Sequence, residues 1–207
     1  MKCCIGDLNF CHVNVIRHDR LADFGIRNLH PVFDRGVRGE TLARRCHKDM
    51  TLEGVRDAGI GTIIDLRTAD HNDRLAMRCN AVGLAYHHIP VDAAVRGKGV
   101  LYADLPLLFD LLDGYGFYIS CQQGLHRTDI ALALYYFFHK DDEVPVMFGH
   151  RTKGFLRCDD IMRRINGMRP LFSNVSDADF AERRKRFLDA NRDFSDIIIN
   201  GVVVNRQ

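Results

Sequence analysis

The stretch FYISCQQGLHRTDIALALYYFF, residues 117–138, decides the fold of this chain. It begins with a short apolar run of strand length, passes through a polar segment that contains one glycine, and ends in an almost wholly apolar run. This order predicts a buried strand over residues 117–120, a tight loop, and a helix over residues 130–138 that is buried on most sides. The helix is expected to begin near Arg127, so its N-terminus faces back to the loop.

Upstream of this stretch, strand-like and helix-like patterns alternate, and several of the helical patterns are closed by glycine. We expect strands at residues 32–37, 61–66 and 86–91, and helices at residues 51–58, 70–82 and 101–112. Such alternation is typical of βαβ units. The sequence therefore predicts an α/β fold with a central, twisted, mostly parallel sheet flanked by helices.

Downstream, two more helices are expected, at residues 154–165 and 177–191. Residues 197–204 form two β-branched runs around Asn200-Gly201, a pair that favours a type I′ turn. We predict a C-terminal β-hairpin, which would dock on the domain or join two copies of the chain in a homo-oligomer. The expected organisation is an N-terminal extension (residues 1–30), one catalytic domain (residues 31–195) and the hairpin tail (residues 196–207).

Composition narrows the class of protein. The chain has 207 residues, of which 46% are hydrophobic, and 29 basic against 27 acidic side chains give a formal charge of +2. No strong overall field therefore favours nucleic acid or an anionic membrane surface. Seven cysteines without regular spacing, and no apolar leader, predict free thiols in the cytoplasm. The apolar run at residues 130–138 is too short to span a bilayer.

A cysteine followed six positions later by arginine could bind and attack phosphate, but the spacing alone is weak. It occurs three times, as Cys11 with Arg17, Cys121 with Arg127, and Cys158 with Arg164. The first pair encloses a β-branched stretch without glycine, and the last encloses two aspartates that would repel an anion. The middle pair encloses no acid and has Gly124 at the bend. We therefore take Cys121 and Arg127 as the candidate site.

These residue types are suited to the transfer of a phosphoryl group to sulfur. Cys121 would be the thiolate nucleophile, and Arg127 would grip two phosphoryl oxygens with its planar fork. The N-terminus of the following helix favours bound anions. The expected phosphate-binding residues of the loop are Gln122, Gln123, Gly124, Leu125, His126 and Arg127. Thr128 could donate a hydrogen bond to the sulfur when the thiolate leaves.

Residues 120–129 resemble the signature of the cysteine-dependent protein tyrosine and dual-specificity phosphatases, in which Cys-x5-Arg is followed by Ser or Thr. The wider stretch from about residue 32 to residue 138 is similar to the small atypical members, including residues 61–67 and 87–91. The resemblance implies hydrolysis of phosphate monoesters through a phosphocysteine intermediate, without metal or cofactor. It implies a phosphorylated protein or a small-molecule phosphate ester as the partner, and neither nucleic acid nor membrane insertion.

Two positions depart from the family pattern. The histidine that precedes the family's cysteine is replaced by Ser120, and the glycine usual after Arg-Thr is replaced by Asp129, whose negative charge would lie near the phosphate. These departures keep open a catalytically weak or inactive phosphate-binding relative. An inositol-phosphate phosphatase and a sulfur carrier of the rhodanese type are also compatible with the sequence.

The general acid that protonates the leaving oxygen lies, in the family, on a mobile loop roughly 30 residues before the cysteine. Asp92 has this place, at the start of a segment that contains Gly97 and Gly99. We expect Asp92 to be the acid, with Asp104 as the second choice.

Overall fold

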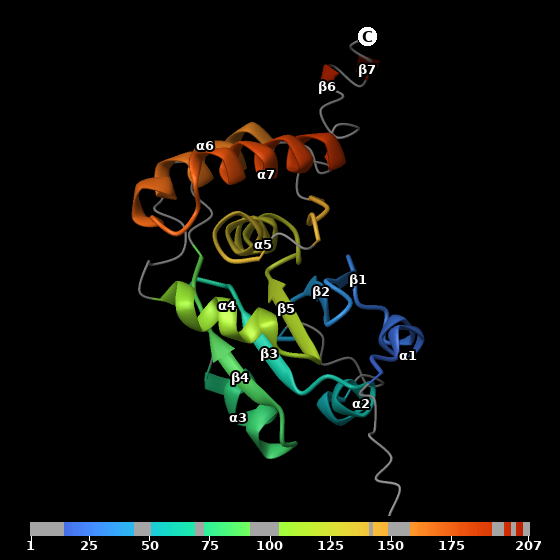
Figure 1. The fold of residues 1–207 in the computed structure, drawn as a ribbon. Coiled ribbons are helices and arrows are strands. Elements are labelled where there is room, and N and C mark those ends of the chain that lie inside the picture. Colours follow the sequence, from blue (N-terminus) through green and yellow to red (C-terminus); the bar gives the residue numbers. More distant parts are fainter. Residues whose placement is uncertain are drawn as a thin grey trace, which may run out of the picture.

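The computed structural model describes residues 15–43, 51–68, 73–91, 104–140, 143–148, 158–191, 197–199 and 202–204. A five-stranded sheet in the order β1-β2-β5-β3-β4 forms the centre of the domain (Figure 1). The strands are β1 (His30–Val32), β2 (Gly36–Glu40), β3 (Thr62–Asp65), β4 (Ala85–His88) and β5 (Phe117–Cys121). Only β1 runs antiparallel to its neighbour in this sheet, so the predicted mostly parallel sheet is confirmed.

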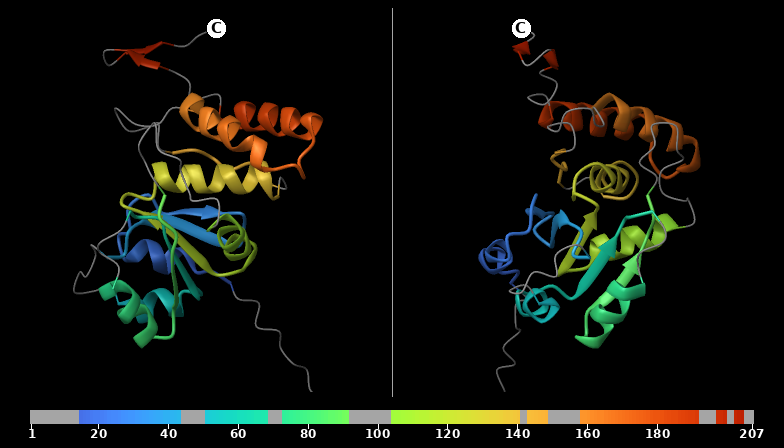
Figure 2. Two further views of the ribbon diagram at one scale, coloured as in Figure 1. Left: turned by 90° about the vertical axis from the view of Figure 1, so that its left-hand side faces the viewer. Right: turned by 180° about the vertical axis from the view of Figure 1, so that it is seen from behind.

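Helices cover both faces of the sheet (Figures 1 and 2). One face packs against α1 (His18–Asp23), α2 (Leu52–Asp57) and α3 (Asp73–Ala81). The other face packs against α4 (Leu105–Asp113) and α5 (His126–Phe138). Beyond α5, and on the side away from the sheet, lie α6 (Cys158–Met168), a short 3₁₀ turn (Arg169–Leu171) and α7 (Asp177–Ala190) (Figure 2). The fold is therefore α/β, as predicted.

Strand β5 and helix α5 form the core that joins these layers. Because side chains alternate along a strand, Tyr118 points to the α1–α3 side while Phe117 and Ile119 point to the α4–α5 side. Every residue of α5 from Thr128 to Phe138 is buried, since the helix has the sheet beneath it and α6 and α7 above it. Each large apolar side chain buried in this way contributes about 2 kcal/mol to the free energy of folding.

The expected strand at residues 32–37 is wrong. These residues hold the end of β1, a tight turn, and the start of β2. Phe33 and Asp34 both have φ near 51°, and the Arg35 amide donates to the Val32 carbonyl at 3.1 Å, which is the pattern of a type I′ turn. Asn or Gly usually marks such a turn, so Phe and Asp at its centre carry no clear signal for it.

The other expected elements inside the described ranges are present, with ends shifted by a few residues. At the C-terminus, β6 (Ile197–Ile199) and β7 (Val202–Val204) pair antiparallel. The connecting Asn200-Gly201 turn lies outside the described residues, so the hairpin and its docking both stay predictions. The domain limits at residues 30 and 195 also stay predictions. Leu21 of α1 lies within the expected N-terminal extension and is fully buried in the core. No helix in the described ranges is long and apolar enough to cross a bilayer.

A polar network ties the C-terminal end of α4 to that of α5. The Asp113 carboxylate accepts hydrogen bonds from the Tyr135 hydroxyl at 2.5 Å and from His139 Nε2 at 2.9 Å, and it pairs with Lys140 Nζ at 2.9 Å. Partial burial disfavours the charged form, but these three groups outweigh it and lower the pKa of Asp113. The carboxylate therefore stabilises the folded state.

Replacing Asp113 with Asn should lower the free energy of unfolding by about 1 kcal/mol near pH 5, because the charged acceptor is lost. Since the folded-state pKa of Asp113 is lowered, its contribution is complete above the unfolded value of about 3.9 and is lost as the pH falls toward the folded value. The gap between wild type and variant in urea titrations should therefore shrink below about pH 4. Asp110→Asn, an exposed position of the same helix, is the control. A gap of equal size at pH 3 would contradict the assignment.

Candidate active site

Strand β5 carries Cys121 to the C-terminal edge of the sheet. Cys121 is the last residue of β5 and lies opposite Glu40, the last residue of β2. Its side chain is only 3% exposed. Helix α5 begins at His126, so residues 122–125 form a short connection between the central strand and the most buried helix. Arg127 lies in the first turn of α5.

The predicted loop residues therefore lie together in one connection. Gln122, Gln123, Gly124 and Leu125 are the connection itself, while His126, Arg127 and Thr128 open the helix. The Cys158–Arg164 pair does not form such a connection. Arg164 lies within α6, as the sequence indicated, and Cys11 lies outside the described residues.

The bend depends on Gly124. This residue has φ of 67°, and a Cβ atom at this position would overlap the backbone carbonyl of Gly39 in β2. Two restrictions thus select glycine here, the left-handed backbone and the direct contact of two main chains.

The loop carbonyls are bonded by side chains from the N-terminal part of the chain. Asn28 Nδ2 donates to the Gln123 carbonyl at 2.8 Å. Arg38 Nη2 donates to the carbonyls of Gly124 at 2.7 Å and of Leu125 at 3.0 Å. A planar trans peptide points its N–H group opposite to its C=O group. The amides that follow these carbonyls, those of residues 124–126, therefore face away from Asn28 and Arg38.

Two of these amides are available to an anion. Within the described ranges, the N–H groups of Gly124 and Leu125 have no hydrogen-bond acceptor. They lie beside the N-terminus of α5, where the helix dipole favours negative charge. A loop of turned amides before a helix N-terminus is the arrangement that binds phosphate oxygens.

Three buried polar side-chain atoms next to the loop also have no partner in the described part of the chain. They are Ser120 Oγ, Arg127 Nε and Thr128 Oγ1. A buried polar atom without a hydrogen bond costs about 1 to 3 kcal/mol, so a group of such atoms in one place needs an explanation, of which a bound ligand, ion or water is one. Ser120 immediately precedes the cysteine, and the other two lie in the first turn of α5.

The Asp129 carboxylate lies on the Arg38 side of the loop, from which the amides of residues 124–126 face away, and this differs from its expected place near a bound phosphate. Its carboxylate pairs with Arg38 Nη2 at 2.5 Å, and both side chains are 1% exposed. It also accepts a hydrogen bond from the Phe148 amide at 3.1 Å. The negative charge is thereby compensated on the β2 side of the loop.

Arg38 was not predicted from the sequence. The only signal is a single arginine between Val37 and Gly39 in a strand that the fold buries, since a charge there needs a partner. The partner is 91 positions away, beyond the reach of local patterns.

Asp92 and Asp104 are the two candidate general acids. Asp92 lies outside the described residues, which end at the buried Val91. Asp104 immediately precedes α4 and makes no capping hydrogen bond through its side chain. Asp92 therefore stays a prediction, with Asp104 as the second choice.

The end of β3 beside the cysteine is fixed by another buried network. Asp65 lies opposite Ser120 in the sheet. Its carboxylate accepts hydrogen bonds from Arg67 Nη2 at 2.6 Å and from the Tyr86 hydroxyl at 2.8 Å. His88 Nε2 lies 2.6 Å from the Arg67 carbonyl. Arg67 thus has a structural role, in which it holds neighbouring strand ends together.

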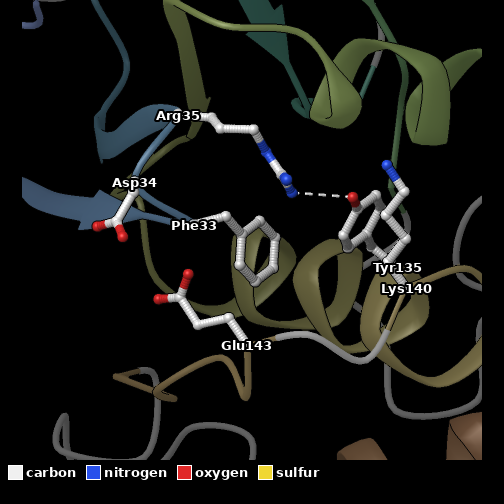
Figure 3. A pocket seen from close by; sticks show the side chains of 6 residues that line it. All are labelled: Phe33, Asp34, Arg35, Tyr135, Lys140 and Glu143. Carbon is white, nitrogen blue, oxygen red and sulfur yellow. Dashed lines mark hydrogen bonds between the residues drawn. The ribbon is translucent and has the colours of Figure 1, made fainter.

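A hollow of about 370 Å³ lies elsewhere (Figure 3). Its lining residues are Phe33, Asp34, Arg35, Tyr135, Lys140 and Glu143. The turn that carries the first three precedes Gly36, which lies opposite Phe117 at the start of β5. The hollow is therefore at the other end of the sheet from Cys121. Figure 3 shows Arg35 reaching to the Tyr135 hydroxyl, at 2.9 Å, with Glu143 opposite.

Gly124→Ala should lower the free energy of unfolding by about 3 kcal/mol, because strain at positive φ adds to the overlap with Gly39. Gly83→Ala is the matched control, since Gly83 has φ of 77° but no atom near the site of a Cβ. That control should cost only about 1 kcal/mol. Chemical denaturation of both variants measures the difference. Equal losses would show that the contact between Gly124 and Gly39 is not restrictive.

No protein-family model matches this sequence, and no curated protein sequence matches it. Several solved structures, in contrast, are similar to this chain. A DUF442 protein from Shewanella putrefaciens CN-32 is 15% identical, with a TM-score of 0.46 over 83% of this chain and 96% of its own. The PTP-2 phosphatase of Cydia pomonella is 13% identical, with a TM-score of 0.45 over 67% and 88% of the two chains. OH1, a tyrosine phosphatase from Orf virus, is 13% identical, with a TM-score of 0.40 over 79% and 76%. These similarities concern the course of the chain and not its activity.

Proposed function

We propose that this protein is a phosphatase that hydrolyses phosphate monoesters through a phosphocysteine intermediate at Cys121. The observation that carries the proposal is the set of polar groups without partners around this residue. The Arg127 Nε, the Thr128 hydroxyl and the amides of Gly124 and Leu125 are all donors, and none has an acceptor in the described part of the chain. Donors gathered at a helix N-terminus beside a thiol match the needs of a phosphoryl group.

The reaction would proceed in two steps. In the first, the Cys121 thiolate attacks phosphorus, the sulfur–phosphorus bond forms, and the bond to the ester oxygen breaks. Asp92 gives its proton to that oxygen, which leaves as an alcohol or a phenol. In the second step, water attacks phosphorus and loses a proton to the same carboxylate. The sulfur leaves as thiolate, and inorganic phosphate is released.

Arg127 and Thr128 would act on charge in both steps. A guanidinium donates to two phosphoryl oxygens at once and remains charged throughout. Its position in the first turn of α5 adds the field of the helix to its own. The Thr128 hydroxyl can donate to sulfur as the second step restores the thiolate.

The loop side chains favour one class of substrate over another. Gln122, Gln123 and Leu125 are neutral, which favours a single phosphoryl group on tyrosine or another alcohol over a polyphosphorylated ring. Arg96, Lys98 and His126 supply the positive charge that an inositol phosphate would need, so that class is the second choice of substrate.

A second candidate function is phosphate binding with little turnover. It is favoured by Ser120, whose hydroxyl has no partner in the described part of the chain and therefore gives the sulfur no fixed support. Such a protein would hold a phosphorylated partner without hydrolysing it.

Replacing Cys121 with Ser should reduce hydrolysis of p-nitrophenyl phosphate by roughly 10⁴-fold or more, since the nucleophile is lost. Vanadate should inhibit the wild type, and mass spectrometry of the quenched reaction should find a phosphoryl group on the Cys121 peptide. Cys79→Ser is the control, because burial raises the pKa of Cys79 to about 11 and keeps that thiol protonated. Phosphate binding without measurable hydrolysis in the wild type would favour the second candidate function.

Replacing Asp92 with Asn should lower kcat by roughly 10²-fold or more, the usual contribution of a general acid. The loss should be larger for phenyl phosphate than for p-nitrophenyl phosphate, because nitrophenolate leaves readily without a proton. Asp110→Asn serves as the control for loss of an acidic side chain. If Asp104→Asn shows the dependence on leaving group instead, Asp104 is the acid.

A further inference from the structure

Arg38 is a buried cation in a strand next to β5. Its side chain is 1% exposed, and removing a charge from water costs several kcal/mol unless partners compensate. Its hydrogen bonds go to the loop after Cys121. The guanidinium donates to the Gly124 carbonyl from both Nε, at 3.0 Å, and Nη2, at 2.7 Å. It also donates to the Leu125 carbonyl and to Asp129 Oδ1.

Asp129 completes the arrangement from the other side. Its carboxylate fixes Arg38, and its amide donates to the Leu125 carbonyl at 2.7 Å. The Leu125 carbonyl is therefore bonded both by the arginine and by the helix. Since each carbonyl direction fixes the direction of the next amide, the pair determines how the loop amides are presented.

Residues 145–148 pack against this pair. The Val146 carbonyl accepts from Arg38 Nη1 at 3.3 Å, and the Phe148 amide donates to Asp129. The Phe148 ring lies over the guanidinium, 4.9 Å from its carbon to the ring centre, and it stacks on His30 at 4.0 Å. These contacts remove water from the ion pair, which strengthens it.

The same short segment is bonded to the end of α7. The side chain of Asn191, which is 2% exposed, accepts from the Met147 amide at 2.9 Å and donates to the Pro145 carbonyl at 3.3 Å. A continuous set of contacts thus runs from α7 through residues 145–148 to the loop.

We propose that Arg38 and Asp129 are positioning residues that set the anion-binding geometry of the cysteine loop, with residues 145–148 holding the pair in place. The proposal rests on the proposed function in taking phosphate as the ligand. Position 38 requires a guanidinium group. A lysine at position 38 has one nitrogen and cannot reach two carbonyls and a carboxylate as the guanidinium fork does.

Phosphate affinity tests the proposal directly. The rate at which iodoacetate alkylates Cys121 is measured, and the concentration of inorganic phosphate that halves this rate gives the dissociation constant. In Arg38→Lys and in Asp129→Asn, this constant should rise about tenfold or more, the effect of losing one charge-assisted hydrogen bond. Both substitutions conserve size, and cooperative thermal unfolding establishes that the variants are folded.

The matched control is Arg35→Lys. Arg35 belongs to the same β1–β2 hairpin and also donates through Nη2, but to Tyr135 at the far end of the sheet (Figure 3). The phosphate affinity of this variant should stay within about twofold of the wild type, because its partner is far from the loop. Unchanged affinity in both Arg38→Lys and Asp129→Asn would overturn the positioning role and leave the proposed function standing.

Amide hydrogen exchange separates the positioning role from the proposed function further, because it can be measured without a ligand. In Arg38→Lys, the amides of Asp129 and Phe148 should exchange about tenfold faster or more, while the amide of Ile119 in β5 stays as slow as in the wild type. If phosphate does not protect Cys121 in the wild type, the proposed function fails, and faster exchange at these two amides would still support the positioning role. Exchange at the wild-type rate would overturn it.

Discussion

The close approach of two main chains, Gly124 in the loop and Gly39 in β2, is the constraint on which this structure depends. The loop can turn from β5 into α5 within a few residues only because it presses against the neighbouring strand. That contact requires β2 to lie parallel to β5 and in register with it, with Glu40 opposite Cys121. The contact also depends on the order of the sheet, in which β2 is the direct neighbour of β5.

Charge at this edge of the sheet is balanced by local pairs. Arg38 is neutralised by Asp129, Arg67 by Asp65, and Glu40 accepts from Arg27. Arg127 differs, because its side-chain Nε has no hydrogen-bond partner within the part of the chain that the structure describes. Its Nε is nevertheless buried. The neighbouring carboxylates are thus each paired with another arginine.

The sequence was sufficient for the elements whose signals are local. The strand before Cys121 and the helix after it could be predicted because continuous apolar runs of those lengths admit few other structures. Residues 32–37 were misread because Phe33 and Asp34 make a turn that usually needs Asn or Gly. Arg38 was missed, and Asp129 was misplaced, for one reason. Their pairing joins residues far apart in the chain, and only the parallel sheet brings them together.

The complete burial of α5 also determines where this site can change. The side chains of α5 after its first turn would disturb the core if altered, whereas Gln122, Gln123 and His126 are at least partly exposed. Two carbonyls of the loop, those of Gly124 and Leu125, accept hydrogen bonds from Arg38 in β2, and that of Leu125 also accepts one from the Asp129 amide in α5. The main chain of the loop is therefore fixed by buried groups, whereas a substitution of one of the three side chains meets solvent and leaves the core unchanged.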